Sequence, residues 1–493
     1  MIFFFIVSIH SVEWKLDQII KPDIDNFGIF GRAVAVSSPT SNVIAVSASW
    51  ETVGNQYKLG TVYVFRYDAT QKEFVQSQKL IPSNTNNRVV LNNTGSTCKI
   101  SSDGTRIVAG APYSTVDGLA EVGALVVWDF NTSSNQFEQT AVIAPNASDV
   151  EEGQGLGRAL TITSDGKTIA SSYYNKPNFK KYQHLQGKVF ISRETANGWS
   201  IPLKLEPRPE YAGQLLKFGS DLRFVDASHL LVATTLFSSF WEAGTMLYRK
   251  QSDTEWVIEQ EIMPAQVTQY NLSNYGSPVS MPQDSQSILG LVGSYNTSLQ
   301  TENPKVSGAF FILQKNQSGS GWETSPQQTV NFPAGIKLTG MDFCKTDSFI
   351  TLGDNIPDPA NASITHDYLY IYSRNAQQQF VQTSTIQPET NPPELLVFSS
   401  DVQWRSDCKM LVVGGMTKYP YDNTLPPSIN DQPSNESRTY IYRIVETEES
   451  KGTDWVLILA SIGGGVLFIA AVIFTVFYVR RNRSSQKEEA EYI

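Results

Sequence analysis

One short sequence pattern recurs along the whole chain at a spacing of about 60 residues. Its clearest copy is SSDGTRIVAGAP, from Ser101 to Pro112, in which a Ser-Asp-Gly turn separates two runs of β-forming residues. Seven anchor positions mark the copies: Gly31, Gly95, Gly157, Gly219, Gly276, Leu338 and Ser399. A strand-rich repeat of this length predicts one four-stranded sheet per copy, and therefore an all-β, seven-bladed β-propeller.

Two further strands accompany each copy. The third strand is usually opened by glycine and alternates aromatic with β-branched residues, as in GTVYVFRY from Gly60 and GALVVWDF from Gly123. This alternation is typical of a half-buried strand. The fourth strand begins with one aromatic residue per copy: Phe74, Phe137, Trp199, Trp256, Trp322 and Phe380.

The seventh copy lacks a fourth strand, because SRTYIYRIV runs directly into an acidic segment. The segment VEWKLDQIIKP, from Val12 to Pro22, has the missing pattern, with Trp14 in the aromatic position. We therefore predict that this N-terminal strand completes the last blade and closes the ring, which removes open sheet edges. The predicted propeller spans residues 12–445.

The two ends of the chain predict a membrane protein. Residues 1–11 resemble a short signal peptide, and residues 455–479 are uncharged over a length that can cross a bilayer as a helix. An acidic stalk, 446–454, precedes this helix, and the tail, 480–493, begins with arginines. This asymmetry predicts a type I single-pass protein with a cytoplasmic tail. The plasma membrane is the expected location, and the endomembrane system is the alternative.

Sequons agree with an extracellular or lumenal position. The predicted N-glycosylation sites are Asn92, Asn131, Asn146, Asn271, Asn296, Asn316, Asn361 and Asn435. Within the membrane helix, the small-residue pairs Ala460/Gly464 and Ser461/Gly465 permit close pairing of two helices, and so allow a dimer.

The repeats resemble a known family. Phe30-Gly31, Phe218-Gly219, the Asp-Gly turns and the Gly110-Ala111-Pro112 exit are similar to FG-GAP repeats, which build the propeller of integrin α-subunit heads. The resemblance covers Val12 to Val445 and is clearest in the first three copies. It implies recognition of a partner at the cell surface. Calcium-carrying members hold the ion in D-x-D-x-D-G loops, whereas Asp103 and Asp165 stand nearly alone and are interpreted as turn residues. No metal or cofactor is expected.

Composition narrows the function further. A net charge of -10 argues against a nucleic-acid partner. The four histidines stand without a catalytic motif around them, so no catalytic residue is predicted and the chain is not expected to be an enzyme. A propeller glycosidase would need paired carboxylates or an arginine cluster on one face. Carboxylates from different blades can converge, and this alternative stays open.

Aromatic residues gather in the loops between the second and third strands. The predicted ligand-binding face consists of Trp50, Tyr57, Tyr113, Tyr174, Tyr182, Trp241, Tyr295 and Tyr421. The favoured function is calcium-independent adhesion or receptor-like recognition of an extracellular protein or glycan. A lumenal cargo-binding or trafficking protein and a glycosidase-type ectoenzyme are the alternatives. Convergent carboxylates and arginines would favour the enzyme.

The three cysteines do not form a disulfide framework. Cys344 and Cys408 lie in consecutive copies and two interpretations remain open for them, a disulfide or small buried hydrophobes. The second interpretation is favoured, as it is for Cys98.

Overall fold

The computed structural model describes residues 12–446 except 23–27, 85–87, 151, 154, 174–186, 201, 206, 208–215, 237–243, 263–271, 281–287, 296–305, 317–320, 334–336, 345–347, 358–364, 387–395 and 418–437. Residues Trp14–Ile444 form one compact unit. Its described elements are β-strands and one short 3-10 turn, η1, Ala147–Asp149. The predicted all-β propeller class is confirmed.

Six sheets contain four strands each. Four of them follow the chain in sequential order: β2 Phe30–Val36, β3 Val43–Ala48, β4 Thr61–Asp68, β5 Glu73–Leu80; β17 Leu216–Asp226, β18 His229–Leu236, β19 Gly244–Ser252, β20 Glu255–Ile262; β21 Leu272–Ser280, β22 Ile288–Tyr295, β23 Val306–Gln314, β24 Gln328–Pro333; β25 Lys337–Cys344, β26 Ser348–Pro357, β27 Thr365–Arg374, β28 Phe380–Ile386. The fifth joins β7 Thr97–Ile100, β8 Arg106–Ala111, β10 Ala124–Asn131 and β11 Gln136–Ile143, and the small pair β6 Val89–Val90 and β9 Thr115–Val116 lies outside it. The sixth contains both ends of the propeller chain: β29 Leu396–Trp404, β30 Met410–Thr417, β31 Arg438–Glu446 and β1 Val12–Ile20.

The third repeat departs from the predicted pattern of seven regular four-stranded sheets. Its sheet has five strands: β12 Ala159–Ile162, β13 Thr168–Tyr173, β14 Lys188–Thr195, β15 Gly198–Trp199 and β16 Leu203–Leu205. Both β15 and β16 pair with β14. Pro202 lies between them, and proline has no N–H for the ladder, so the outer strand is interrupted there.

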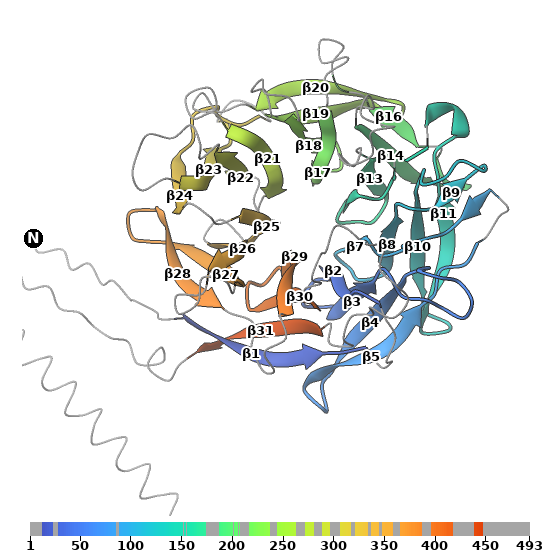
Figure 1. Ribbon diagram of the computed structural model, residues 1–493, viewed down its shortest axis with the longest axis horizontal. Helices are drawn as coiled ribbons and strands as arrows, with labels where there is room; N and C mark the ends of the chain where they lie inside the picture. Colours follow the sequence, from blue (N-terminus) through green and yellow to red (C-terminus); the bar gives the residue numbers. More distant parts are fainter. Residues whose placement is uncertain are drawn as a thin grey trace, which may run out of the picture. The chain divides into compact units, whose positions relative to one another are not determined.

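The sheets are arranged around a common centre, and the labelled strands nearest to it are β2, β7, β17, β21, β25 and β29 (Figure 1). Neighbouring innermost strands contact one another in the cyclic order β2, β7, β12, β17, β21, β25, β29 and back to β2. Side chains from different repeats therefore meet near this centre.

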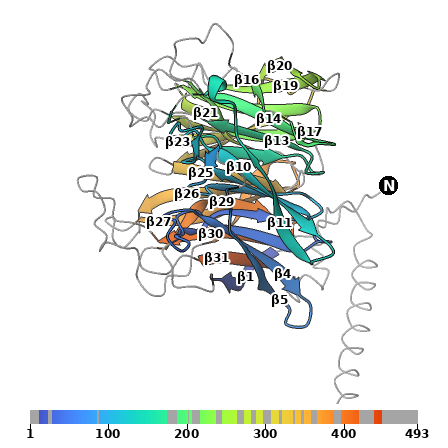
Figure 2. The same ribbon diagram turned by 90° about the vertical axis from the view of Figure 1, so that its right-hand side faces the viewer.

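The N-terminal strand closes the ring as predicted. The last sheet has the order β1-β31-β30-β29, so β1 is its outer strand. β1 lies beside β31 in both views (Figures 1 and 2). The ring of Trp14 packs edge-on against Trp404, with centroids 5.0 Å apart. The pairing supplies the missing outer strand and covers the edge of β31.

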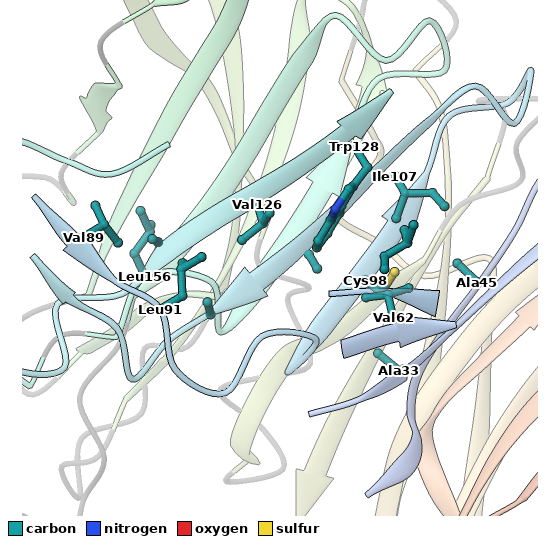
Figure 3. Close-up of a cluster of buried hydrophobic side chains, with 14 of the residues drawn as sticks. Ala33, Ala45, Val62, Val89, Leu91, Cys98, Ile107, Val126, Trp128 and Leu156 are labelled. Carbon is teal, nitrogen blue, oxygen red and sulfur yellow. The ribbon is translucent and has the colours of Figure 1, made fainter. Parts of the chain in front are cut away.

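Apolar side chains fill the space between neighbouring sheets. In the cluster of Figure 3, Val62 and Ala45 come from the first sheet, and Ile107 and Trp128 come from the second. Cys98 lies fully buried among them as a free thiol, which confirms its interpretation as a small buried hydrophobe. Burial of these faces is the main source of stability in such a fold.

Glutamine side chains join the outer strands of neighbouring sheets. In each case the amide accepts a hydrogen bond from the N–H of an aromatic residue in the next sheet and donates to the carbonyl of that residue. The pairs are Gln18 with Phe74, Gln78 with Phe137, Gln260 with Trp322, and Gln328 with Phe380. We call these pairs the glutamine clasps. They satisfy the backbone groups of these aromatic residues. Phe74, Phe137 and Phe380 lie at the start of an outer strand, and Trp322 precedes β24.

The interpretation of Cys344 and Cys408 as separate buried hydrophobes is wrong. The two residues form a disulfide, with Cα atoms 5.6 Å apart. Cys344 ends β25, and Cys408 lies in the turn between β29 and β30. Equivalent ends of successive sheets lie close together in a propeller, so one repeat of separation brings the two thiols into bonding range.

Several predicted segments lie outside the described residues. These are 1–11, 447–454, 455–479 and 480–493, which include the predicted signal peptide, transmembrane helix and tail. Within the described part of the chain, no helix has the length and apolar character needed to cross a membrane.

Candidate functional site

Polar and charged side chains recur at one position of the innermost strands. This position carries Lys99, Thr161, Arg223, Ser280, Asp342 and Gln403. Asp401 lies two residues before Gln403 on β29. We call these seven residues the axial belt. The register supports their equivalence, since each of the first six pairs with the third residue of the second strand of its repeat: Val108, Ala170, Leu231, Gly290, Ile350 and Val412.

Belt side chains bond to the neighbouring sheet. The oxygens of Thr161, Ser280 and Gln403 accept hydrogen bonds from the N–H groups of Phe224, Phe343 and Val36, at 3.4, 3.2 and 3.3 Å. These N–H groups belong to the innermost strand of the next sheet. The bonds therefore tie the repeats together around the centre and hold the belt side chains in fixed positions.

Asp342 is the most deeply buried ionisable member of the belt, with 5% of its surface exposed. Its Oδ2 accepts a hydrogen bond from the N–H of Trp404 at 3.0 Å, and its Oδ1 lies 3.4 Å from the hydroxyl of Ser280. Burial raises the pKa of the Asp342 carboxyl above its ordinary value. The charge of Asp401 raises this pKa further, whereas Arg223, Lys99 and the Trp404 N–H oppose the shift.

The belt also brings distant sheets together electrostatically. Lys99 and Asp342 come from sheets that are not neighbours in the cyclic order, yet the charge of Lys99 acts on the Asp342 carboxyl. Asp401 accepts a hydrogen bond from the N–H of Val34 at 2.9 Å. Burial raises the pKa of the Cys98 thiol to about 12, with Lys99 opposing and Asp401 adding to the rise. Two carboxyl groups and two cations thus lie within electrostatic range of one another.

A second buried carboxylate has a different environment. Glu51 accepts hydrogen bonds from the hydroxyl of Tyr63, at 3.0 Å, and from that of Thr61, and it pairs with the ammonium of Lys79. All of these partners come from one sheet. The charge of Glu51 is therefore neutralised locally, and we assign it a structural role in the first sheet.

Three of the predicted ligand-binding aromatics have described side chains. Trp50 and Tyr57 lie together around Lys58, whose Nζ is 4.1 Å and 5.0 Å from their ring centroids. Tyr113 has the guanidinium of Arg158 over its ring at 5.3 Å. Cations of the chain itself thus occupy these ring faces. Tyr57 nevertheless remains 71% exposed.

The other five predicted aromatics have no described side chain. Tyr295 ends β22, and its side chain is not described. The remaining four lie outside the described residues: Tyr174, Tyr182, Trp241 and Tyr421. Ligand binding by the aromatic loops stays a prediction.

Asp103 and Asp165 are turn residues, as predicted. The Asp103 carboxylate accepts hydrogen bonds from the N–H of Thr105 at 3.0 Å and from the hydroxyl of Ser101. The Asp165 carboxylate likewise accepts hydrogen bonds from the N–H of Lys167 and from the hydroxyl of Thr163. Burial acts to raise both pKa values, but these hydrogen bonds outweigh it and lower them. In the described ranges, no group of three or more His, Cys, Asp and Glu residues is placed to hold a metal ion.

Half of the predicted sequons are described. The Asn131 amide donates a hydrogen bond to Glu138 at 2.9 Å, the Asn146 amide faces Asp149 at 3.4 Å, and the backbone N–H groups of Asn92 and Asn316 are bonded. Asn271, Asn296, Asn361 and Asn435 lie outside the described residues. Glycosylation stays a prediction at all eight.

Sequence analysis missed the axial belt, although a signal was present. Each belt position except Asp401 is the fourth residue after a repeat anchor: Gly95 precedes Lys99, Gly219 precedes Arg223, and Leu338 precedes Asp342. Aligning the seven copies at this position would have shown polar residues in six of them, each between apolar neighbours, with Ala35 in the first copy. The structure adds that four of these side chains, those of Thr161, Ser280, Asp342 and Gln403, bond to the innermost strand of the next sheet.

The fold and the site define a β-propeller with charged groups converging on its innermost strands. No family model and no curated protein matches the chain, so the FG-GAP resemblance has no support from either comparison. Among solved structures, it is similar to a periplasmic gluconolactonase from Pseudomonas aeruginosa (13% identity, TM-score 0.44, covering 72% of this chain and 85% of the other). Two putative 6-phosphogluconolactonases are also similar. One is from Bacteroides uniformis (9% identity, TM-score 0.46, covering 76% of this chain and 88% of the other). The second is from Bacteroides fragilis (10% identity, TM-score 0.45, covering 82% of this chain and 99% of the other).

The names of these solved structures disagree with the function that sequence analysis favoured. Sequence analysis favoured an adhesion or receptor-like protein without enzymatic activity. The solved structures found are named as enzymes. The axial belt also shows the convergence of carboxylates and cations that would favour an enzyme. Sequence reasoning missed this convergence of charged groups because they come from different repeats and meet only when the ring closes.

Proposed function

We propose that the chain is a hydrolase whose reaction centre is the axial belt. The observation that carries the proposal is the buried Asp342 carboxyl with its raised pKa, set among Asp401, Lys99 and Arg223. Strongly perturbed carboxyl groups with specific charged neighbours are typical of acid–base centres. Because the belt is rich in hydrogen-bonding side chains, its substrate is a hydroxylated, sugar-like molecule with a hydrolysable C–O bond.

The two carboxyl groups take complementary roles. Asp342, with its raised pKa, keeps its proton to a higher pH than an ordinary aspartate and donates it to the leaving oxygen. Asp401 accepts a proton from the attacking water. The C–O bond of the substrate breaks, the water oxygen forms the new bond, and solvent exchange restores both carboxyl groups. Lys99 and Arg223 stabilise negative charge that develops on oxygen.

A substrate screen with charge-neutral variants tests this assignment. The purified full chain is assayed on chromogenic glycosides and on sugar lactones, which separates the two kinds of C–O bond. With any substrate that is cleaved, we expect Asp342→Asn to lower kcat/KM about 100-fold or more. Asp117→Asn, in an exposed ion pair with Arg88, is the matched control and should leave the rate unchanged. Absence of hydrolysis on both panels, or full activity in Asp342→Asn, would overturn the proposal.

The position of the reaction centre outside the cytosol is also a proposal. The Cys344–Cys408 disulfide supports it, since disulfides persist mainly in oxidising compartments. The predicted sequons and membrane helix are consistent with the same topology. Protease protection of membrane vesicles, combined with enzymatic deglycosylation, tests it. A propeller that is digested from the cytosolic side and carries no glycan would contradict it.

The finer architecture belongs to the same proposal. The five-stranded sheet of the third repeat is counted as a blade, which gives seven blades in total. The repeats are assigned the FG-GAP pattern. Support comes from the anchor glycines Gly31, Gly95, Gly157 and Gly219, which all have positive φ, between 81° and 102°. Only glycine adopts this backbone region freely, which explains the residue type at each anchor. An experimental density map of the ectodomain counts the blades directly.

A further inference from the structure

The Cys344–Cys408 disulfide and the Asp342 carboxyl share the same pair of neighbouring sheets. Cys344 is the last residue of β25, and Asp342 lies two residues before it on that strand. Cys408 follows β29, which carries Asp401 and Trp404. Two residues of strand span about 7 Å, so the covalent link lies close to the buried carboxyl along β25.

A hydrogen bond crosses the same junction. The Trp404 N–H donates to Asp342 Oδ2 at 3.0 Å. This bond exists only while β25 and β29 keep their present separation, because hydrogen-bond strength falls steeply with distance and angle. The disulfide fixes that separation at the turn end of the two strands, since it bonds Cys344 to the turn that follows β29.

The turn that carries Cys408 is itself held firmly. The Cys408 N–H donates to the carbonyl of Arg405 at 2.9 Å, and the Arg405 N–H donates to the carbonyl of Met410 at 2.9 Å. The Arg405 guanidinium bonds to Asp407, at 2.7 Å, and to the Asn42 side chain of the first sheet, at 2.8 Å. The disulfide therefore connects β25 to an anchored turn, and a restraint at Cys344 is transmitted to Asp342.

We propose that the Cys344–Cys408 disulfide is a positioning element for Asp342, which keeps the carboxyl buried and bonded to the Trp404 N–H. The inference rests on the proposed function for its catalytic consequence, but its structural content can be tested without any substrate. Without the covalent link, the junction of β25 and β29 opens more often and the carboxyl is more extensively hydrated than in the intact protein. Loss of the Trp404 bond alone would raise the Asp342 pKa, but burial is the largest cause of the shift, so hydration outweighs this loss and Asp342 titrates closer to an ordinary aspartate.

Linkage between proton binding and stability tests the structural content. The free energy of unfolding is measured against pH for the full chain and for Asp342→Asn, each with the disulfide intact and as Cys344→Ala/Cys408→Ala. A carboxyl whose pKa is raised in the folded state favours folding at low pH, and this contribution is lost as pH rises through its folded pKa. The difference between parent and Asp342→Asn therefore reports the Asp342 titration.

We expect the midpoint of this difference to fall by about one pH unit when the disulfide is removed. Gln260→Leu is the matched control, because it breaks a link between two other neighbouring sheets, and it should leave the midpoint unchanged. If the disulfide-free variant does not fold, mild reduction of the folded wild-type chain replaces it, with hydrogen exchange of the Trp404 amide as the measurement. Faster exchange at Trp404 supports the proposal.

The outcomes separate the two proposals. An unchanged Asp342 midpoint, or unchanged exchange at Trp404 in reduced folded protein, overturns the positioning role even if hydrolysis is found. If hydrolysis is absent on every substrate but the midpoint falls, the positioning role stands and the proposed function fails. Where both hold, removal of the disulfide lowers kcat about tenfold. It also shifts the basic limb of the pH–rate profile to lower pH, because Asp342 loses its proton at lower pH.

Discussion

The Gln260 side chain and the Trp322 backbone form a two-point hydrogen bond between neighbouring sheets. Gln260 Nε2 donates to the Trp322 carbonyl at 2.6 Å, and the Trp322 N–H donates to Gln260 Oε1 at 2.8 Å. Trp322 itself is fully buried. One side chain thus satisfies both backbone groups of a core residue, and the same arrangement recurs in three other clasps.

Removal of a clasp should destabilise the fold. Gln260→Leu leaves the buried Trp322 N–H and carbonyl without their partner, and an unsatisfied buried group costs about 1 to 3 kcal/mol. We expect a loss of unfolding free energy in that range by chemical denaturation. Gln71→Leu, at an exposed turn, is the control and should stay within about 0.5 kcal/mol of wild type. Equal effects of the two substitutions would contradict the role of the clasps.

Trp14 should matter because it joins the first strand to the last sheet. Its ring packs edge-on against Trp404 and borders a core cluster that includes Val413 and Tyr442. Trp14→Ala removes this half-buried contact, and we expect a loss of about 2 to 3 kcal/mol. Limited proteolysis should then release β1 earlier than other strands. Unchanged stability and an unchanged cleavage order would argue against closure by β1.

Substitutions at two glycines can distinguish the cost of backbone strain from the cost of a steric clash. Gly157 has φ +102°, and a Cβ there would lie 2.8 Å from the Gly110 Cα. Gly54 also has positive φ, +58°, but no atom lies within 4 Å of its Cβ position. Gly54→Ala should cost about 1 kcal/mol from the backbone alone. Gly157→Ala should cost at least about twice as much, because the neighbouring strand must also move. Thermal unfolding of the two variants, compared at one pH, decides the point.

Glu194 should contribute a pH-dependent part of the stability. The Arg106 guanidinium, 2.7 Å away, is the main cause that lowers the pKa of the Glu194 carboxyl. A lowered folded pKa gives a contribution that is present above the ordinary glutamate pKa and lost as pH falls through the folded value. Glu194→Gln should therefore lower the melting temperature slightly at pH 7 and not at pH 3. Because Glu194 is partly exposed, the effect is small, and 1 M salt should reduce it. A difference that persists at pH 3 would point to packing instead of charge.

Local patterns were enough to predict the repeat and its closure. The Asp-Gly turn at Asp103, the aromatic position of Trp14 and the alternation after Gly60 each report a local conformational preference. The structure has a turn at Asp103 and strands at the other two places. The clasps were also visible, because Trp14 and Gln18, Phe74 and Gln78, and Trp256 and Gln260 share one spacing. The irregular third sheet follows from Pro202.

The site could not be predicted in the same way. Asp342, Asp401, Lys99 and Arg223 lie far apart in the sequence, and their significance comes from burial and mutual charge that exist only in the closed ring. The disulfide was left open for a related reason, because pairing depends on the approach of two turns from different sheets. Each of these features is a property of tertiary structure.

The pairing of β1 with β31 sets the order in which the protein can be completed. Residues 12–20 leave the ribosome before the rest of the propeller, but their partner strand, residues 438–446, is synthesised last. Throughout translation, β1 has no strand to pair with, and the growing array keeps an open edge at each end. Joining the two ends is a long-range contact with a large loop-closure cost, so we expect it to be the slow step of folding. A chain interrupted before residue 438 would therefore remain an open, aggregation-prone array.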